Sequence, residues 1–146
     1  MKFQIQDEET WSETWPQIEG KAGIYKVFSI DTKTGKNLSI PRILDIDDSG
    51  TIYIGMSKNL SARIAEVRKS LFGAYQHGDY KSVSAHQTGK KASEVFRANF
   101  PIEAMWVEIF PGDVSGEEGP YDARKEESRM LSAYVDKFGD TPPLNA

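Results

Sequence analysis

The chain changes from strand-like to helix-like patterning at Gly55, and this change constrains its fold more than any other feature. Residues 22–30 (AGIYKVFSI) and 51–56 (TIYIGM) are rich in β-branched and aromatic side chains, which predicts two strands. Beyond Gly55, apolar residues recur at the spacing of a helix, at Leu60, Ile64, Val67 and Leu71. Ser57 is the N-cap that this pattern predicts.

The rest of the chain completes an α+β pattern. Residues 90–98 predict a short helix, residues 102–110 a third strand, and residues 123–139 a terminal helix with Gly139 past its end. The order β-β-α-α-β-α predicts a small mixed or antiparallel sheet of about three core strands, flanked by helices.

Length and composition fit one domain with a short lead-in. We expect a helical or irregular lead-in over residues 1–21 and the domain proper over residues 22–146. No apolar run approaches the roughly 20 residues that cross a bilayer, and the start MKFQIQDEETW lacks a signal-peptide pattern. The chain has no cysteine, which excludes disulfides and thiolate zinc sites. These features predict a cytoplasmic protein with no membrane partner.

The charge is unevenly distributed along the chain. The net charge is -4, but residues 56–100 contain eight basic and three acidic side chains, a local balance of +5 against -9 elsewhere. A basic middle suits contact with phosphate groups. Chance clustering on a solvated surface explains the same counts at least as well.

Two charged residues fall on apolar helix faces. On the terminal helix, Glu127 lies near the centre of the stripe formed by Met130, Leu131, Tyr134, Val135 and Phe138. A carboxylate there needs a cation or several donors. The alternative is that Glu127 lies at the end of the stripe, where the helix leaves the core, and pairs with a lysine. On the first helix, Arg63 lies on the shoulder of the apolar face, where it either extends to solvent or reaches an anion.

Two tyrosines and a glycine suggest a pocket beside these charges. Tyr25 and Tyr53 lie on adjacent expected strands, and Gly55 faces the same side as Tyr53. Buried tyrosines usually pack with a satisfied hydroxyl. The missing side chain at Gly55, however, leaves room for a close approach to the backbone, so we also expect it to contact substrate.

The triplets Gly23-Ile24-Tyr25 and Tyr53-Ile54-Gly55 spell GIY and YIG, and the arrangement resembles the GIY-YIG nuclease superfamily. The resemblance covers about residues 22–145. It includes Arg63 ten residues after Tyr53, Glu127 before two apolar helix positions, and Asn145 after two prolines. His86 fits the family's histidine best, with His77 and Tyr80 as alternatives. The gap of 28 residues between the two tyrosines departs from the shortest members.

The resemblance implies a metal-dependent endonuclease whose partner is DNA. In that reading Glu127 holds one divalent cation, Mg²⁺ or Mn²⁺, and Arg63 stabilises charge on the scissile phosphate. Tyr25 acts as general base or orients the attacking water, Tyr53 and His86 form a relay, and Asn145 ties the C-terminal tail to the site. The same reading assigns nonspecific phosphate contacts to Lys58, Lys90 and Lys91.

Two other readings stay open, and some properties are unassigned. One reading is a catalytically weak or inactive domain that binds DNA or a protein, and the other is an unrelated α+β domain with accidental triplets. The sequence assigns neither a DNA specificity nor an oligomeric state.

Overall fold

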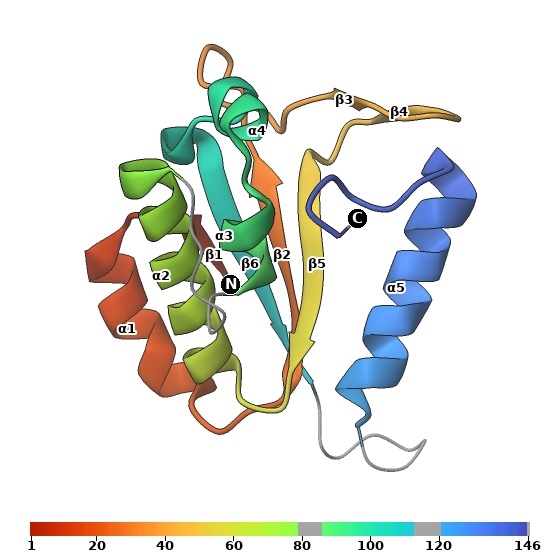
Figure 1. Ribbon diagram of the computed structural model, residues 1–146. Coiled ribbons are helices and arrows are strands. Elements are labelled where there is room, and N and C mark those ends of the chain that lie inside the picture. Colours follow the sequence, from red (N-terminus) through yellow and green to blue (C-terminus); the bar gives the residue numbers. More distant parts are fainter. Residues whose placement is uncertain (79–85, 113–120, 146) are drawn as a thin grey trace.

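The computed structural model describes residues 1–78, 86–112 and 121–145. Its centre is an antiparallel four-stranded sheet in the order β1-β6-β2-β5 (Figure 1). The strands are β1 (Lys2–Gln4), β2 (Gly23–Ser29), β5 (Thr51–Ser57) and β6 (Met105–Pro111). The α+β class is confirmed, and the sheet has four strands, all antiparallel, where about three were expected.

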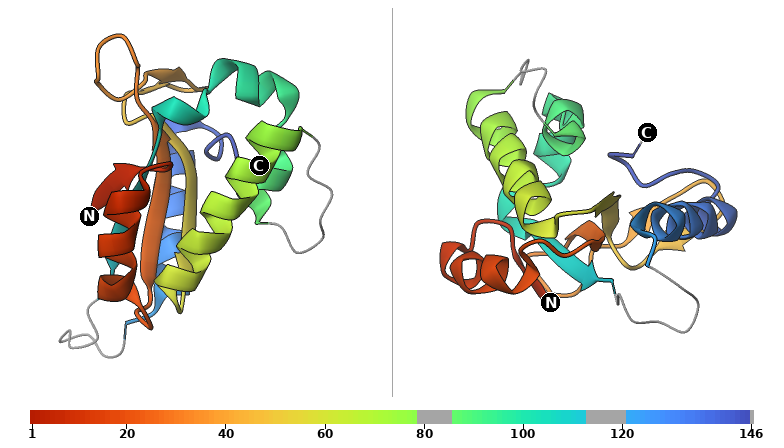
Figure 2. Two further views of the ribbon diagram at one scale, coloured as in Figure 1. Left: turned by 90° about the vertical axis from the view of Figure 1, so that its left-hand side faces the viewer. Right: turned by 90° about the horizontal axis from the view of Figure 1, so that it is seen from below.

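Helices cover both faces of the sheet, as the two views in Figure 2 show. One face carries α1 (Glu8–Ile18) and α2 (Leu60–His77), followed by the short helices α3 (Gln87–Lys91) and α4 (Glu94–Asn99) and the 3-10 turn η1 (Ile102–Ala104). The other face carries α5 (Ala123–Phe138). Strand alternation divides the side chains between the faces: Tyr25 and Val27 join the main core under α2, whereas Ile24 and Ile54 pack against α5.

The N-terminal segment belongs to the main core. Residues 1–21 were expected as a lead-in, but β1 pairs with β6, with Phe3 opposite Val107. The side chains of Phe3, Ile5 and Ile18 are buried in the main core. Arg68 of α2 fastens the segment, because its Nε donates to the Ile5 carbonyl and its guanidinium lies against Trp11 of α1. The segment therefore contributes a strand and a helix to the same folding unit.

Two local predictions need correction. The first long helix begins after Asn59, which is its N-cap, whereas Ser57 ends β5 and accepts a hydrogen bond from the Asn59 amide. The helix expected over residues 90–98 is two helices, since Ser93 caps α4 by accepting from the Phe96 amide. The terminal helix is confirmed, with Gly139 in the left-handed conformation at its C-cap.

The long connection between β2 and β5 forms a small hairpin of β3 (Ile40–Pro41) and β4 (Ile46–Asp47). Asp47 is buried and holds the following turn, because its carboxylate accepts from the Ser49 and Thr51 amides. The Tyr134 hydroxyl of α5 donates to the same carboxylate at 2.8 Å. The hairpin is thus fixed to the helix that covers this face. In the described part of the chain, no helix is long and apolar enough to cross a bilayer.

Candidate active site

The two tyrosines lie side by side over Gly55. Tyr25 of β2 pairs with Gly55 of β5 in the antiparallel register, and Tyr53 is two residues before Gly55 on the same face. The ring centroids are 5.9 Å apart. A Cβ added to Gly55 would lie 2.5 Å from the Tyr25 hydroxyl and 2.7 Å from Cε1 of Tyr53. The glycine therefore makes room for the two rings to meet over the strand.

The two phenols differ in burial. The Tyr25 side chain is 0 % exposed, whereas Tyr53 is half-buried. Burial raises the pKa of Tyr25 well above its usual range. Burial also raises the pKa of Tyr53, but a hydrogen bond from Tyr25 opposes that shift. Tyr53 is thus the phenol with access to solvent, although Tyr25 was expected to meet the attacking water.

His86 completes the cluster. It is the N-cap of α3, and its Nε2 lies 2.9 Å from the Tyr25 hydroxyl. The ring also meets Tyr53 edge-on, with centroids 5.4 Å apart. Burial, followed by the charge of Arg63, lowers the pKa of His86 to about 4. Of the two alternatives, His77 is exposed at the end of α2, and Tyr80 lies outside the described residues.

Arg63 stands at the start of α2, where the chain leaves the YIG strand. Its side chain is 42 % exposed, and its Nε lies 3.8 Å from the carboxylate of Glu66, a loose pair that contributes little to stability. The guanidinium charge lowers the pKa of Tyr25 and Tyr53, and it also lowers that of His86. An arginine that acts on all three rings and is only weakly paired is able to turn toward an anion.

Glu127 approaches the same region from α5. Its side chain is half-buried, and this burial raises the carboxyl pKa, while a hydrogen bond from the Met56 backbone and the charges of Arg124 and Arg63 lower it. Met56 belongs to β5, so the carboxylate lies against the strand that carries Tyr53. Glu127 forms no ion pair with any lysine among the described residues.

The buried apolar face of α5 is narrower than the sequence predicts. Val135 is 37 % exposed, so the buried line runs through Ala123, Tyr134 and Phe138, with Met130 partly buried. Glu127 lies one turn beyond Ala123 on this line. The prediction of a carboxylate on the core-facing side therefore holds, although one apolar member of the stripe faces solvent.

Asn145 holds the C-terminal tail against β5. Its side-chain oxygen accepts from the Ile54 amide at 2.9 Å, and its side-chain nitrogen donates to the Ile54 carbonyl at 2.8 Å. The Leu144 amide donates to the Ile52 carbonyl at 2.9 Å. These bonds fix the backbone between Tyr53 and Gly55, so Asn145 acts on the strand rather than pointing at the phenols.

The remaining predicted residues lie on the surface near these elements. Lys58 is exposed between β5 and α2, and Lys90 and Lys91 are exposed in the last turn of α3. The sequence did not single out Arg124, although its position three residues before Glu127 was a usable signal. Ser70 and Thr88, which hold His86, were also missed, because only the folded chain brings α2 and α3 together.

The candidate site offers few protein ligands for a hard divalent cation such as Mg²⁺. Among the described residues, no group of three or more histidine, aspartate or glutamate side chains could hold a metal ion. Glu127 offers a carboxylate that is partly desolvated. Mg²⁺ retains several waters and takes substrate phosphate oxygens, so one such carboxylate is a sufficient protein ligand in a phosphate site.

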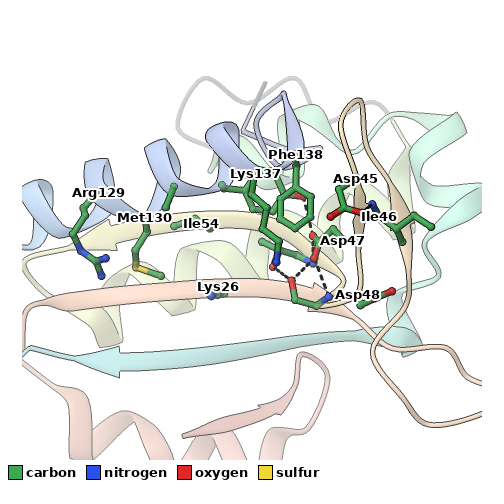
Figure 3. Close-up of a pocket in the computed structure, with 14 residues that line it drawn as sticks. Lys26, Asp45, Ile46, Asp47, Asp48, Ile54, Arg129, Met130, Lys137 and Phe138 are labelled. Carbon is green, nitrogen blue, oxygen red and sulfur yellow. Dashed lines mark hydrogen bonds between the residues drawn. The ribbon is translucent and has the colours of Figure 1, made fainter.

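A cavity of about 470 Å³ lies on the opposite face of the sheet, between α5 and the turn after β4 (Figure 3). Lys26, Lys137 and Asp48 are among its charged residues, and Ile54 and Met130 are among its apolar ones. None of the predicted site residues lines it. It is therefore separate from the tyrosine cluster.

Comparisons with protein-family models, with curated proteins and with solved structures found no match.

Proposed function

We propose that this chain is a metal-dependent endonuclease of the GIY-YIG type, which hydrolyses DNA phosphodiester bonds at a single site. The contact of Tyr25, Tyr53 and His86 beside Gly55 supports the proposal most, with the Tyr25 hydroxyl 2.9 Å from His86 Nε2. The charge of Arg63 in addition lowers the pKa of these three rings and of Glu127. Two phenols and an imidazole are thus in contact, and the charge of one weakly paired guanidinium reaches them and the Glu127 carboxylate. A phosphodiester needs such a combination, because charge develops on its oxygens as it is attacked.

The roles of the side chains follow from their chemistry. Arg63 binds the scissile phosphate by charge-assisted hydrogen bonds. Glu127 is the residue that would hold one Mg²⁺ or Mn²⁺. When bound, such a cation polarises a phosphoryl oxygen and lowers the pKa of a coordinated water. Lys58, Lys90 and Lys91 contact neighbouring phosphates, which position DNA without reading its sequence. The cytoplasmic location stays a prediction.

A catalytically weak or inactive domain that binds DNA or a protein is the second candidate. The complete burial of Tyr25 favours it, because a phenol whose hydroxyl is bonded to His86 also serves as an ordinary core residue. The two candidates share the same surface and differ in whether a phosphodiester bond is broken.

The deciding experiment is a nicking assay on supercoiled plasmid with Mg²⁺ or Mn²⁺, with and without EDTA. The wild-type chain is compared with Glu127→Gln and Arg63→Ala. Glu126→Gln is the matched control, because Glu126 is the preceding residue on α5 but pairs with the exposed Arg129. We expect metal-dependent nicking by the wild type and the control. Loss of an essential ligand or of Arg63 should lower the rate by about 100-fold or more.

Absence of nicking by the wild type with either metal would remove the nuclease proposal. Fluorescence anisotropy with a labelled duplex then tests the second candidate directly. Binding without cleavage would support a DNA-binding module.

A further inference from the structure

A second cavity, of about 510 Å³, lies between α5 and the strands β2 and β6. Lys26, Arg129 and Met130 line both this cavity and the first one, so the two are neighbours along α5 (Figure 3). Ile24 of β2 and Phe110 of β6 are among its apolar residues. None of the described residues expected at the catalytic site lines it. Its volume falls in the range of roughly 300–1,000 Å³ that is usual for small-ligand sites.

Lys26 carries the charge that decides what this cavity can bind. It lies on the inner strand β2, faces α5 and is half-buried. Glu108 lies opposite it on β6, yet in the described part of the chain Lys26 forms no ion pair. Arg129, by contrast, is paired with Glu126. A half-buried ammonium without a counter-charge is costly, so an anion that enters the cavity is best bound at Lys26.

Aromatic rings lie beside that ammonium. The Nζ atom of Lys26 is 5.7 Å from the ring centroid of Phe110, and Phe110 is 40 % exposed. The half-buried ring of Tyr121 lies over the Gly112 backbone, where an added Cβ would collide with it. Met130 of α5 adds a polarisable apolar side chain to the same lining. The cavity thus combines an ammonium group with flat apolar faces.

The backbone around the cavity excludes an added peptide strand. β2 pairs with β5 and β6, and β6 pairs with β1 and β2, so both strands use their amide and carbonyl groups within the sheet. A ligand is therefore held by side chains. An aliphatic acid would use the ammonium but not the ring faces. A nucleotide uses both, because its phosphate is anionic and its planar base stacks on aromatic rings.

We propose that this second cavity binds one nucleotide, with its phosphate at Lys26 and its base against Phe110 and Tyr121. A lysine ammonium binds phosphate as a point charge. A free nucleoside monophosphate and an unpaired nucleotide within a DNA strand present the same chemistry to it. The site lies across the sheet from the tyrosine cluster, so it is a binding surface beyond the proposed function and does not depend on whether the chain cleaves DNA.

Binding is tested by NMR on the full chain, labelled with ¹⁵N and kept in EDTA so that no metal-dependent reaction occurs. Thymidine 5′-monophosphate should shift the amide signals of Lys26, Phe110 and Met130 and reach saturation. Thymidine and inorganic phosphate, which each carry half of the ligand, should bind at least about tenfold more weakly. Hexathymidylate identifies the source: tighter binding than the monophosphate assigns the site to a DNA strand, and equal or weaker binding assigns it to a free nucleotide.

Three variants locate the site. Lys26→Met keeps the length of the side chain and removes its charge, which should raise the Kd about tenfold. Phe110→Leu keeps an apolar side chain and removes the flat ring, which should raise the Kd about fivefold. Lys137→Met is the matched control, because Lys137 lines the first cavity and not the second. Its Kd should equal that of the wild type.

Four results would overturn the proposal. The first is the absence of a saturable shift with thymidine 5′-monophosphate. The second is inorganic phosphate or octanoate that binds as tightly as the monophosphate. The third is wild-type affinity in Lys26→Met, and the fourth is an equal loss in Lys137→Met, which would place the ligand in the first cavity; native NMR spectra verify that both variants fold. If the nucleotide binds but the wild type does not nick plasmid, the proposed function fails and this site stands.

Discussion

Replacement of Gly55 by alanine tests whether the space over β5 is what lets the two tyrosines meet. The added Cβ would lie 2.5 Å from Cζ and the hydroxyl of Tyr25, and 2.7 Å from Cε1 of Tyr53. Real Cβ atoms do not approach other heavy atoms that closely, so at least one ring must move. Both rings are constrained, because Tyr25 is fully buried and Tyr53 lies against His86.

The net cost can be worked from two opposing effects. Alanine restricts the unfolded chain and by itself stabilises by about 0.4–1 kcal/mol. Overpacking against rigid neighbours costs about 1–3 kcal/mol. The sum is a loss of up to roughly 2.6 kcal/mol, with a midpoint of about 1.3 kcal/mol that in a chain of this length lowers Tm by about 3–5 °C. The same displacement separates Tyr53 from Tyr25, so nicking should fall by at least about tenfold, equivalent to 1.4 kcal/mol in the transition state.

The assay combines thermal unfolding, followed by circular dichroism, with plasmid nicking. Gly20→Ala is the control: its backbone has φ of 71°, a conformation that disfavours side chains, but nothing lies within 4 Å of the added Cβ. That variant should lose about 1 kcal/mol of stability and keep full activity. A Gly55→Ala chain with wild-type Tm and wild-type nicking would refute the packing argument.

Three further results are expected. The free energy of unfolding should fall by about 3 kcal/mol as pH decreases from 6.5 toward 4, because folding lowers the pKa of His86 to about 4 and the unfolded chain binds the proton more readily. Urea unfolding at several pH values measures this change, and His86→Gln should lose most of it. Glu127→Gln should raise Tm at pH 7 while it abolishes nicking, since burial raises the pKa of this carboxyl and so makes its charged form unfavourable at neutral pH; an unchanged or lower Tm would contradict this reasoning. Asn145→Ala should cost about 1–3 kcal/mol through the two lost bonds to Ile54, and exchange of the Ile54 amide hydrogen should accelerate.

The sequence predicts those elements whose pattern is local. The α+β class and the terminal helix follow from hydrophobic periodicity and from Gly139 at the C-cap. The strand β1 has three residues, too few to show alternation, and its partner β6 lies about a hundred residues further along the chain. The helix expected over residues 90–98 divides into α3 and α4 at Ser93, a capping residue that is visible in the sequence.

The same division between local and tertiary information applies to the candidate site. Alternation along one strand predicts that Tyr53 and Gly55 face the same side, whereas the register that sets Tyr25 opposite Gly55 appears only in the folded sheet. His86 is the predicted histidine that lies against both tyrosines. Which phenol is buried could not be predicted, because it depends on where α3 crosses the sheet. The contacts of Ser70 and Thr88 with His86 also arise only in the folded chain.

The bonds of the C-terminal tail have a consequence for assembly. β5 is the outer strand of the sheet, and such a strand offers unpaired amide and carbonyl groups to any other extended chain. Asn145 and Leu144 occupy those groups at Ile54 and Ile52, so a side chain stands where a fifth strand would otherwise bind. Proteolysis before Leu144 would therefore open a template for edge-to-edge pairing between molecules, and the trimmed chain should associate with increasing concentration in light scattering while the intact chain does not.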